Sequence, residues 1–333
     1  MVRPRVTIAQ IADEAGVSLP TVSKVLNGRS DVSAETRAKV ERLMRHHGYR
    51  RQRTSGVSSS PMVDLVFHDL GSPWAVELIR GVEAEADRQG VEVVITETGA
   101  GRAPQQGWVD SVLRRKPAGV VLVMSGLVAE QRARLEARRI PYVTVDPQGD
   151  DPGGPSIGCA SFRGGYLATR HLLELGHRRV ATITGPTGAL ASRLRLAGYR
   201  EALTEAGVPV TEELVRPGAW GFPDGYAEGQ ALLGLPQPPT AVFAGSDLQA
   251  MGVVRAAADQ GLRVPDDISV VGFDDLPLVQ WLNPPLTTVR QPLVEMAETA
   301  TRMVLQLSRG EQPPATSLEL AVELVVRAST APA

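Results

Sequence analysis

Residues 7–28 read Thr7-Ile-Ala-Gln-Ile-Ala-Asp-Glu-Ala-Gly-Val-Ser-Leu-Pro-Thr-Val-Ser-Lys-Val-Leu-Asn-Gly28, and this stretch decides the fold of the N-terminal part of the chain. Apolar residues recur at helical spacing up to Ala15, Gly16 then ends the helix, and Ser18 caps a second one. Two short helices joined by a tight turn that contains glycine predict a helix-turn-helix. A third helix is expected from Ser33, with apolar residues along one face.

The charge of the chain is unevenly distributed. Residues 1–53 hold eleven Lys and Arg against five Asp and Glu, so they carry +6, and the other residues must carry −8 to give the net charge of −2. Packed apolar stripes alone would also fit a three-helix bundle with no role in nucleic-acid binding. The basic excess instead favours a segment that binds the phosphates of DNA.

Length and composition indicate a globular protein of two or three domains. The chain has 333 residues, and it contains no run of about 18 apolar residues that could span a membrane. The N-terminus is polar and basic and does not resemble a secretory signal, so we expect a cytoplasmic protein. The single cysteine, Cys159, cannot form an internal disulfide or a site of several thiolates. We expect no metal ion and no cofactor.

From Met62 the sequence alternates between apolar strands and helices, and the alternation starts again after Gly164. Near-continuous apolar runs separated by helical patterns are typical of parallel strands that are covered on both faces. We therefore expect an α/β effector domain of two doubly wound parallel-sheet lobes with a crevice between them. Residues 50–61 in front of it lack periodicity and are expected to form a linker.

Motifs in the head and in the second half of the chain resemble those of one known family. Residues 6–27 read Val-Thr-Ile-x-x-Ile-Ala-x-x-Ala-Gly-Val-Ser-x-x-Thr-Val-Ser-x-Val-Leu-Asn, and later motifs are His-Leu-x-x-Leu-Gly-His-Arg-Arg-Val at 171–180, Ser-Asp-x-x-Ala-x-Gly at 246–252 and Pro-Leu-Thr-Thr-Val-x-Gln at 285–291. In these motifs the chain resembles the LacI/GalR family of transcriptional repressors. The resemblance implies periplasmic binding protein-like lobes, three crossings of the chain between them, and C-terminal strands that complete both sheets.

The pattern and the resemblance together predict the domain boundaries. A helix-turn-helix DNA-binding domain is expected over 1–49, a hinge over 50–61, and an effector-binding and dimerisation domain over 62–333. Its lobes are expected over about 62–160 with 291–319 and over about 161–290 with 320–330. The family's hinge helix wedges a leucine into the minor groove of DNA, whereas this chain has Ser58 there, so we expect a weak hinge helix or none.

The head is expected to bind DNA mainly through outward side chains of its second helix. Lys24 should reach a base edge or a phosphate, and Leu19 and Pro20 should make apolar contacts such as one with a thymine methyl group. The predicted DNA-binding residues are Thr7, Ile8, Ser18, Leu19, Pro20, Thr21, Ser23, Lys24, Asn27, Ser33, Thr36, Tyr49 and Arg53. One head contacts few phosphates, so a homodimer on a palindromic double-stranded operator is expected.

The candidate effector site follows from the strand ends, because open α/β sheets bind ligands beyond the carboxyl ends of their strands. Carboxylates, hydroxyls and indoles are frequent there, and they suit the hydroxyl pairs and apolar faces of a carbohydrate. The resemblance adds Arg195 as a guanidinium fork. The predicted effector-binding residues are Asp69, Ser72, Trp74, Ser125, Asp146, Phe162, Arg195, Trp220, Ser246, Asp247 and Asp274.

Other interpretations of these residues remain open. Asp247 could equally cap the helix that follows it, and Trp220 could be a structural plug in its loop. A hydrolase would need carboxylates on both sides of one bond, but Asp274 and Asp275 are adjacent and should point apart. The chain also lacks the sequence motifs of serine hydrolases, zinc proteases and phosphate-binding loops. We therefore do not expect an enzyme.

The sequence thus predicts a DNA-binding transcriptional regulator, most simply a repressor of carbohydrate-utilisation genes that a small sugar releases. Trp74 and Trp220 on different lobes favour a di- or oligosaccharide. A purine-like molecule or another co-repressor is the alternative effector. A sugar-binding protein without a DNA role is a further alternative.

Overall fold

The computed structural model describes residues 8–26, 32–46, 61–99, 103–149 and 153–333. The chain divides into two units, residues 1–60 and 61–333, here called the head and the body. Several predictions lie outside the described residues, namely those for Thr7, Asn27, Tyr49, Arg53 and the hinge up to residue 60. Ile8 and Ser23 lie in helices, but their side chains are not among those described.

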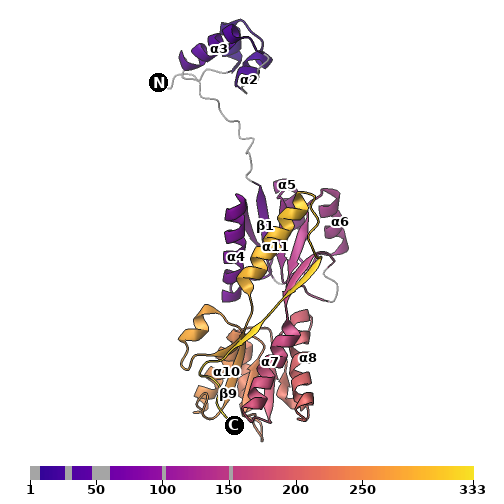
Figure 1. The fold of residues 1–333 in the computed structure, drawn as a ribbon, viewed down its shortest axis with the longest axis vertical. Coiled ribbons are helices and arrows are strands. Elements are labelled where there is room, and N and C mark those ends of the chain that lie inside the picture. Colours follow the sequence, from indigo (N-terminus) through magenta and orange to yellow (C-terminus); the bar gives the residue numbers. More distant parts are fainter. Residues whose placement is uncertain (1–7, 27–31, 47–60, 100–102, 150–152) are drawn as a thin grey trace. The chain divides into compact units, whose positions relative to one another are not determined.

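Three helices form the described part of the head (Figure 1), with bounds α1 Ile8–Ala15, α2 Leu19–Leu26 and α3 Ala34–His46. Gly16 ends α1 with a φ of +65°, a conformation that glycine adopts without steric cost. A small apolar core holds the helices together, and it consists of Ile11, Ala12, Ala15, Val22, Val25 and Val40. The predicted helix-turn-helix is confirmed.

Two six-stranded sheets form the body (Figure 1), one in each lobe. The first has the order β11-β5-β4-β3-β1-β2, and the second β12-β10-β9-β8-β6-β7. Among the strands of the described residues, only β10 and β12 pair antiparallel, and all other pairs are parallel. The strand bounds are β1 Met62–Phe67, β2 Glu92–Glu97, β3 Gly119–Val123, β4 Tyr142–Val145, β5 Ser156–Cys159, β6 Val180–Ile183, β7 Val215–Arg216, β8 Ala241–Ala244, β9 Ser269–Asp274, β10 Thr287–Arg290, β11 Ser317–Leu320 and β12 Glu323–Val325.

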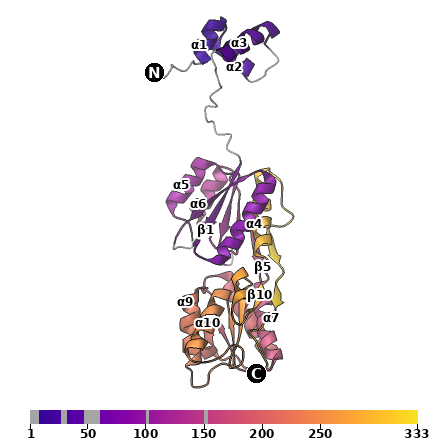
Figure 2. The same ribbon diagram turned by 90° about the vertical axis from the view of Figure 1, so that its left-hand side faces the viewer.

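Helices cover both faces of each sheet (Figure 2). Alternate residues of β1 show why: Leu65 packs in the core on the side of α4, and Val66 packs with residues of α5 and α6 on the other side. The helix bounds are α4 Pro73–Gln89, α5 Gln106–Arg115, α6 Ala129–Ala137, α7 Ser161–Glu174, α8 Leu190–Glu205, α9 Phe222–Leu233, α10 Asp247–Asp259 and α11 Leu293–Ser308. The predicted pair of doubly wound lobes is confirmed.

The chain crosses between the lobes three times, after β5, after β10 and after β11. The second crossing leads to α11, which packs on α4 and on strands of the first sheet. The helices α6 and α11 were not predicted from the sequence. Short 3-10 helices occur at Glu212–Leu214 and Pro277–Trp281. No helix in the described ranges is both long and apolar enough to cross a membrane.

Candidate functional site

A cavity of about 670 Å³ lies between the two lobes of the body. The first lobe contributes residues that follow β1, β3 and β4, and the second contributes residues that follow β6, β8 and β9 and residues near the starts of α8 and α9. The carboxyl ends of both sheets therefore meet at this cavity, as expected for a ligand site in an α/β fold. Its volume suits a small organic molecule.

Most of the predicted effector-binding residues lie in the wall of this cavity. They are Asp69, Ser72, Trp74, Asp146, Arg195, Trp220, Ser246 and Asp274. The cavity is also lined by four residues that were not predicted, namely Met124, Gln148, Leu248 and Leu276. Each of these lies within two residues of a predicted position, so the strand-end rule located the segments but not every side chain.

Three predicted residues do not line the cavity. Ser125 is buried next to the wall, and its Oγ has no hydrogen-bond partner among the described residues. Phe162 lies in the first turn of α7 and is 41% exposed. Asp247 is completely buried. The structure thus brings together eight of the eleven predicted effector-binding residues.

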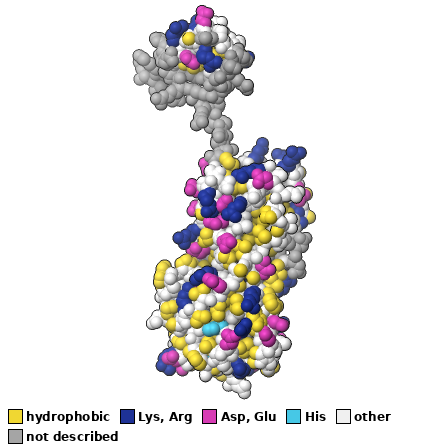
Figure 3. Space-filling model, viewed as in Figure 1, with side chains coloured by type: hydrophobic (Ala, Val, Ile, Leu, Met, Phe, Trp, Pro, Cys, Tyr) yellow, Lys and Arg dark blue, Asp and Glu magenta, His cyan; other side chains and the backbone are white. Residues whose placement is uncertain are grey.

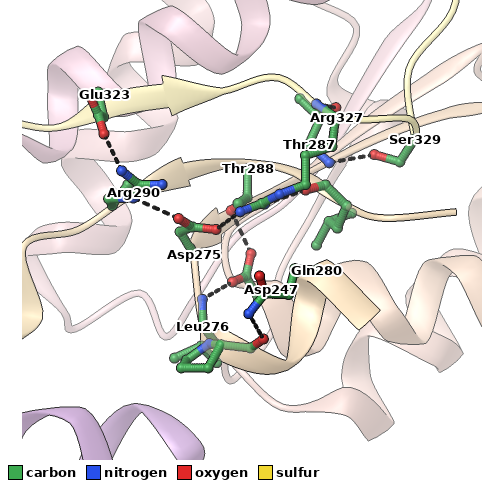
Figure 4. Close-up of polar contacts among 12 residues, drawn as sticks. Asp247, Asp275, Leu276, Gln280, Thr287, Thr288, Arg290, Glu323, Arg327 and Ser329 are labelled. Carbon is green, nitrogen blue, oxygen red and sulfur yellow. Dashed lines mark hydrogen bonds and ion pairs between the residues drawn. The ribbon is translucent and has the colours of Figure 1, made fainter. Parts of the chain in front are cut away.

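Asp247 does not line the cavity, and its carboxylate holds the loop at Leu276 next to β10 (Figure 4). Its carboxylate accepts hydrogen bonds from the backbone N–H of Leu276 at 2.7 Å and from Thr288 Oγ1 at 2.5 Å. It is not the helix cap, because Ser246 caps α10 by accepting from the N–H of Gln249. Burial raises the pKa of Asp247 well above its usual value, with a further contribution from the charge of Asp274.

Arg195 is held rigidly in the cavity wall. Its guanidinium carbon lies 3.5 Å from the ring centre of Phe273 and 4.8 Å from that of Trp220, and Nη1 donates to the carbonyl of Gly245 at 2.5 Å. The α7–α8 contact sets this position, because a Cβ on Gly165 would lie 2.1 Å from the carbonyl oxygen of Arg195. Arg195 therefore presents donors in a fixed geometry.

Two buried donors in the wall lack a partner among the described residues, namely Arg195 Nε and Trp220 Nε1. A buried donor without a hydrogen bond costs free energy of about 1–3 kcal/mol. A ligand with several acceptor oxygens could satisfy both once side chains of the wall move, because neither nitrogen is exposed in this structure. This is the chemical property of the second lobe's wall that most clearly points to a ligand.

The acidic side chains of the wall have unusual proton affinities. Loss of water raises the pKa of Asp274 to about 7, although Arg195 opposes the shift and Asp146 adds to it. Loss of water likewise raises the pKa of Asp146 to about 6, again opposed by Arg195. Asp274 Oδ1 lies 3.9 Å from Arg195 Nη1, so the one guanidinium only partly balances the two carboxylates. Near pH 7 these raised pKa values leave the two carboxyl groups only partly ionised, and an anionic ligand would raise both pKa values further, at a cost in binding free energy.

Several residues that line this cavity have a strained backbone conformation. Four of its lining residues have a positive φ, namely Met124 at 48°, Asp146 at 48°, Trp220 at 72° and Asp274 at 120°. Such conformations are unfavourable for residues other than glycine and are frequent at binding sites, where the surrounding structure enforces them. The fold therefore aims these side chains into the crevice at a cost in free energy.

Asp275, next to Asp274, takes part in a separate ionic network (Figure 4). Its carboxylate accepts from Arg290 Nε and from Arg327 Nη2, each at 2.6 Å, and Arg290 Nη1 reaches Glu323 at 2.5 Å. Arg290 ends β10 and Glu323 begins β12. The network therefore joins the segments at the second and third crossings.

In the head, exposed side chains of α2 lie where the DNA contacts were predicted. Leu19, Pro20 and Lys24 are exposed. Ser18 Oγ accepts from the N–H of Thr21 at 3.3 Å, and Ser33 Oγ accepts from the N–H of Thr36 at 3.2 Å. These two hydroxyls thus cap α2 and α3, a role compatible with phosphate contacts at a helix N-terminus.

Charges on the body are mixed, in contrast to the basic composition of the head. Figure 3 shows acidic and basic side chains interspersed over one face of the body. Among the described residues there is no group of three or more His, Cys, Asp or Glu side chains that could hold a metal ion.

Comparison with known proteins identifies both parts of the chain. Residues 7–52 match the family model of bacterial regulatory proteins of the lacI family, and residues 169–330 match a periplasmic binding protein-like domain. The HTH-type transcriptional repressor CytR of Escherichia coli strain K12 is 32% identical over 97% of this chain and 96% of CytR.

Two solved structures are similar over 98% of this chain and 100% of their own. The complex of the transcriptional regulator CelR with cellobiose has a TM-score of 0.75 at 33% identity. The lac repressor dimer bound to operator and the anti-inducer ONPF has a TM-score of 0.78 at 31% identity.

A helix-turn-helix head joined to a two-lobed ligand-binding body defines a class of DNA-binding regulators that respond to small molecules. The matches extend over nearly the whole length of the chain and of its relatives. The chain belongs to the lacI family of bacterial regulatory proteins and is a DNA-binding transcriptional regulator. The resemblance inferred from the motifs is confirmed.

Proposed function

We propose that this protein is a cytoplasmic repressor that binds a palindromic operator as a homodimer and that an uncharged di- or oligosaccharide releases it from DNA. The observation that carries the choice of effector is the composition of the cavity wall. It combines buried, unpartnered donors with an excess of carboxylates. The protein binds its effector without chemical conversion, in keeping with relatives that are named as regulators.

The charge of the wall favours an uncharged effector. Asp69, Asp146 and Asp274 line the cavity, and Arg195 is the single lysine or arginine among its described lining residues. A sugar phosphate or a uronic acid would bring another negative charge into this low-dielectric space. A neutral sugar instead offers hydroxyl protons to the carboxylates and hydroxyl oxygens to the donors of Arg195 and Trp220.

Two indoles favour an effector with more than one ring. Trp74 lines the cavity from the first lobe and Trp220 from the second. Indole faces stack on the apolar C–H faces of sugar rings, and a cavity of about 670 Å³ has room for a disaccharide. The similarity to CelR, solved with cellobiose, supports the same class of effector for this protein.

A thermal-shift screen tests the effector. Cellobiose, maltose, lactose and cello-oligosaccharides are compared with sugar phosphates and with adenosine and hypoxanthine, because a ligand that binds only the folded state raises the melting temperature. We expect neutral oligosaccharides to raise it and sugar phosphates to have no effect. A response to purines alone would overturn the sugar assignment and leave the DNA-binding function intact.

A pair of lysine variants tests how the head binds DNA. We propose that Lys24 on α2 reads a base edge, and Lys24→Ala should then weaken binding to an operator selected from random duplexes by about tenfold or more. Lys39 is an exposed lysine on α3, so Lys39→Ala removes the same charge as a control. Fluorescence anisotropy measures both affinities. Equal losses in the two variants, on operator and on random DNA alike, would reduce Lys24 to a phosphate contact.

A further inference from the structure

Gln291 lies at the junction of the lobes and contacts both walls of the cavity. It occupies the second crossing, between β10 and α11, and is 4% exposed. Its backbone N–H donates to the carbonyl of Asp274 at 3.2 Å, and its side-chain Oε1 accepts from Trp74 Nε1 at 3.0 Å. Asp274 belongs to the wall of the second lobe and Trp74 to that of the first.

The same side chain reaches the first crossing. Gln291 Nε2 donates to Cys159 Sγ at 3.2 Å, and Sγ lies 3.5 Å from Ser161 Oγ. Cys159 ends β5 and Ser161 begins α7, so the two residues span the segment where the chain leaves the first lobe. One buried amide thus connects the first two crossings with a side chain of the cavity wall.

The donors and acceptors in this chain of contacts fix the orientation of the amide. An indole N–H can only donate, so the oxygen of Gln291 must face Trp74 and its NH2 group must face Cys159. Burial raises the pKa of Cys159 to about 12, so the sulfur remains a thiol that can accept weakly from Gln291. The amide of Gln291 can therefore satisfy Trp74 and Cys159 in one orientation only.

We infer that Gln291 is a positioning residue that fixes the Trp74 indole to the interlobe crossings, so that an effector resting on this indole acts directly on the segments about which the lobes move. This inference concerns regulation and rests on the proposed function. The Trp74 indole cannot follow the ligand freely, because the only polar group of this side chain is bound to Gln291. A shift of the indole therefore displaces the crossing, or the hydrogen bond breaks.

Gln291→Met tests the inference, because methionine has a similar length and makes neither hydrogen bond. Gln131→Met is the matched control: Gln131 is a buried glutamine of α6 that accepts from Val128 N–H at 3.2 Å and donates to the carbonyl of Pro104 at 2.5 Å, all within the first lobe. Cys159→Ala is a milder variant that removes only the contact with the first crossing. Circular dichroism and melting confirm that each variant is folded.

Hydrogen exchange in the full-length, sugar-free protein gives the first measurement. The indole N–H of Trp74, assigned with Trp74→Phe, should exchange about tenfold faster in Gln291→Met than in the wild type. Backbone amides of 159–163 should also exchange faster in Gln291→Met and in Cys159→Ala, but not in Gln131→Met. Unchanged exchange at both places in a folded Gln291→Met protein would overturn the inference.

The second measurement is the ratio of operator affinities without and with saturating cellobiose. Gln291→Met should reduce this ratio about fivefold or more, while operator affinity without sugar stays unchanged. The reason is that allosteric coupling depends on how the effector site and the DNA-binding site are linked, and not on either site alone. A full wild-type ratio in Gln291→Met would overturn the inference. If the wild-type protein does not respond to cellobiose, cellobiose is not its effector, and the exchange experiment still decides the role of Gln291.

Discussion

Asp274 and Asp275 are neighbours in the sequence, yet the structure predicts that replacing each with asparagine changes stability in opposite directions. Burial raises the pKa of Asp274 from 3.8 to about 7 in the folded protein. A carboxyl group with a raised folded pKa contributes stability below its unfolded pKa, and this contribution is lost as the pH rises through the folded pKa. Between about pH 4 and pH 7, Asp274 should therefore make the sugar-free body progressively less stable.

The size of the effect follows from the change in pKa. At 1.36 kcal/mol per pKa unit, a change from 3.8 to about 7 corresponds to about 4 kcal/mol at pH 8. Asparagine has the same shape without the charge, so Asp274→Asn should raise the free energy of unfolding by up to this amount. At about pH 5 the folded carboxyl group is already protonated, and the gain should fall below about 2 kcal/mol. For a domain of this size, about 4 kcal/mol corresponds to about 8 °C in melting temperature.

Asp275→Asn is the control, because it removes the same charge one residue further along. The Asp275 carboxylate accepts hydrogen bonds from Arg290 and Arg327, whose side chains are 48% and 20% exposed. Losing these charge-assisted hydrogen bonds should lower the free energy of unfolding by about 1–3 kcal/mol, reduced by solvent screening at Arg290.

Urea and thermal unfolding of the sugar-free protein at about pH 5 and pH 8 measure both variants, with the transition of the body followed separately from that of the head. Two results would refute the reasoning: no stabilisation by Asp274→Asn at the higher pH, or a stabilisation that is the same at both values. Either result would mean that burial of this charge is not what costs free energy in the crevice.

Two further substitutions probe packing and a buried ion pair. A Cβ on Gly185 would lie 2.1 Å from carbons of the Trp220 indole, so Gly185→Ala should displace the indole. Calorimetry should then show cellobiose binding weakened about tenfold or more, with operator affinity unchanged. Retained sugar affinity would mean that Trp220 does not contact the ligand. Asp64 is fully buried and accepts from Arg115 at 2.7 Å, so Asp64→Asn should cost about 3 kcal/mol in urea unfolding. Asp110→Asn, which breaks the more exposed pair with Arg134, should cost less than about 1 kcal/mol, and similar costs would contradict the role of burial.

The fold could be predicted because its buried strands appear in the sequence as short, continuous apolar runs. All five residues of β3 are buried, and such a run fits only a strand with both faces covered. The helix α6 was missed because its sequence, AEQRARLEA, is mostly charged or polar and buries only two residues. The helix α11 was also missed, although its buried residues Leu293, Met296, Ala297, Ala300 and Val304 recur at helical spacing and could have revealed it.

The site was predictable at the level of segments but not of individual side chains. Asp247 and Asp274 both lie near the carboxyl end of a strand and look equivalent in the sequence, yet Asp274 lines the cavity and Asp247 is completely buried away from it. The direction of Asp247 depends on the N–H of Leu276 and the hydroxyl of Thr288, which are 29 and 41 residues away. The hydrogen bond between Trp74 and Gln291 spans 217 residues. Only the folded arrangement of both lobes reveals such contacts.

The division of the site between the lobes supplies the physical basis for switching. A ligand can shift a conformational equilibrium only by its difference in affinity for the two states. The unpartnered donors of Arg195 and Trp220 are on the second lobe, and the indole of Trp74 is on the first.

A sugar can satisfy both donors and also rest on Trp74 only when the lobes lie close enough for one molecule to touch all three. The donors of Arg195 and Trp220 lie on one lobe and can be satisfied in either arrangement. The contact with Trp74 is the one that requires the lobes to approach, so it supplies the difference in free energy of binding that shifts the equilibrium. Because Gln291 ties Trp74 to the crossings, this free energy is available at the segments that set the angle between the lobes.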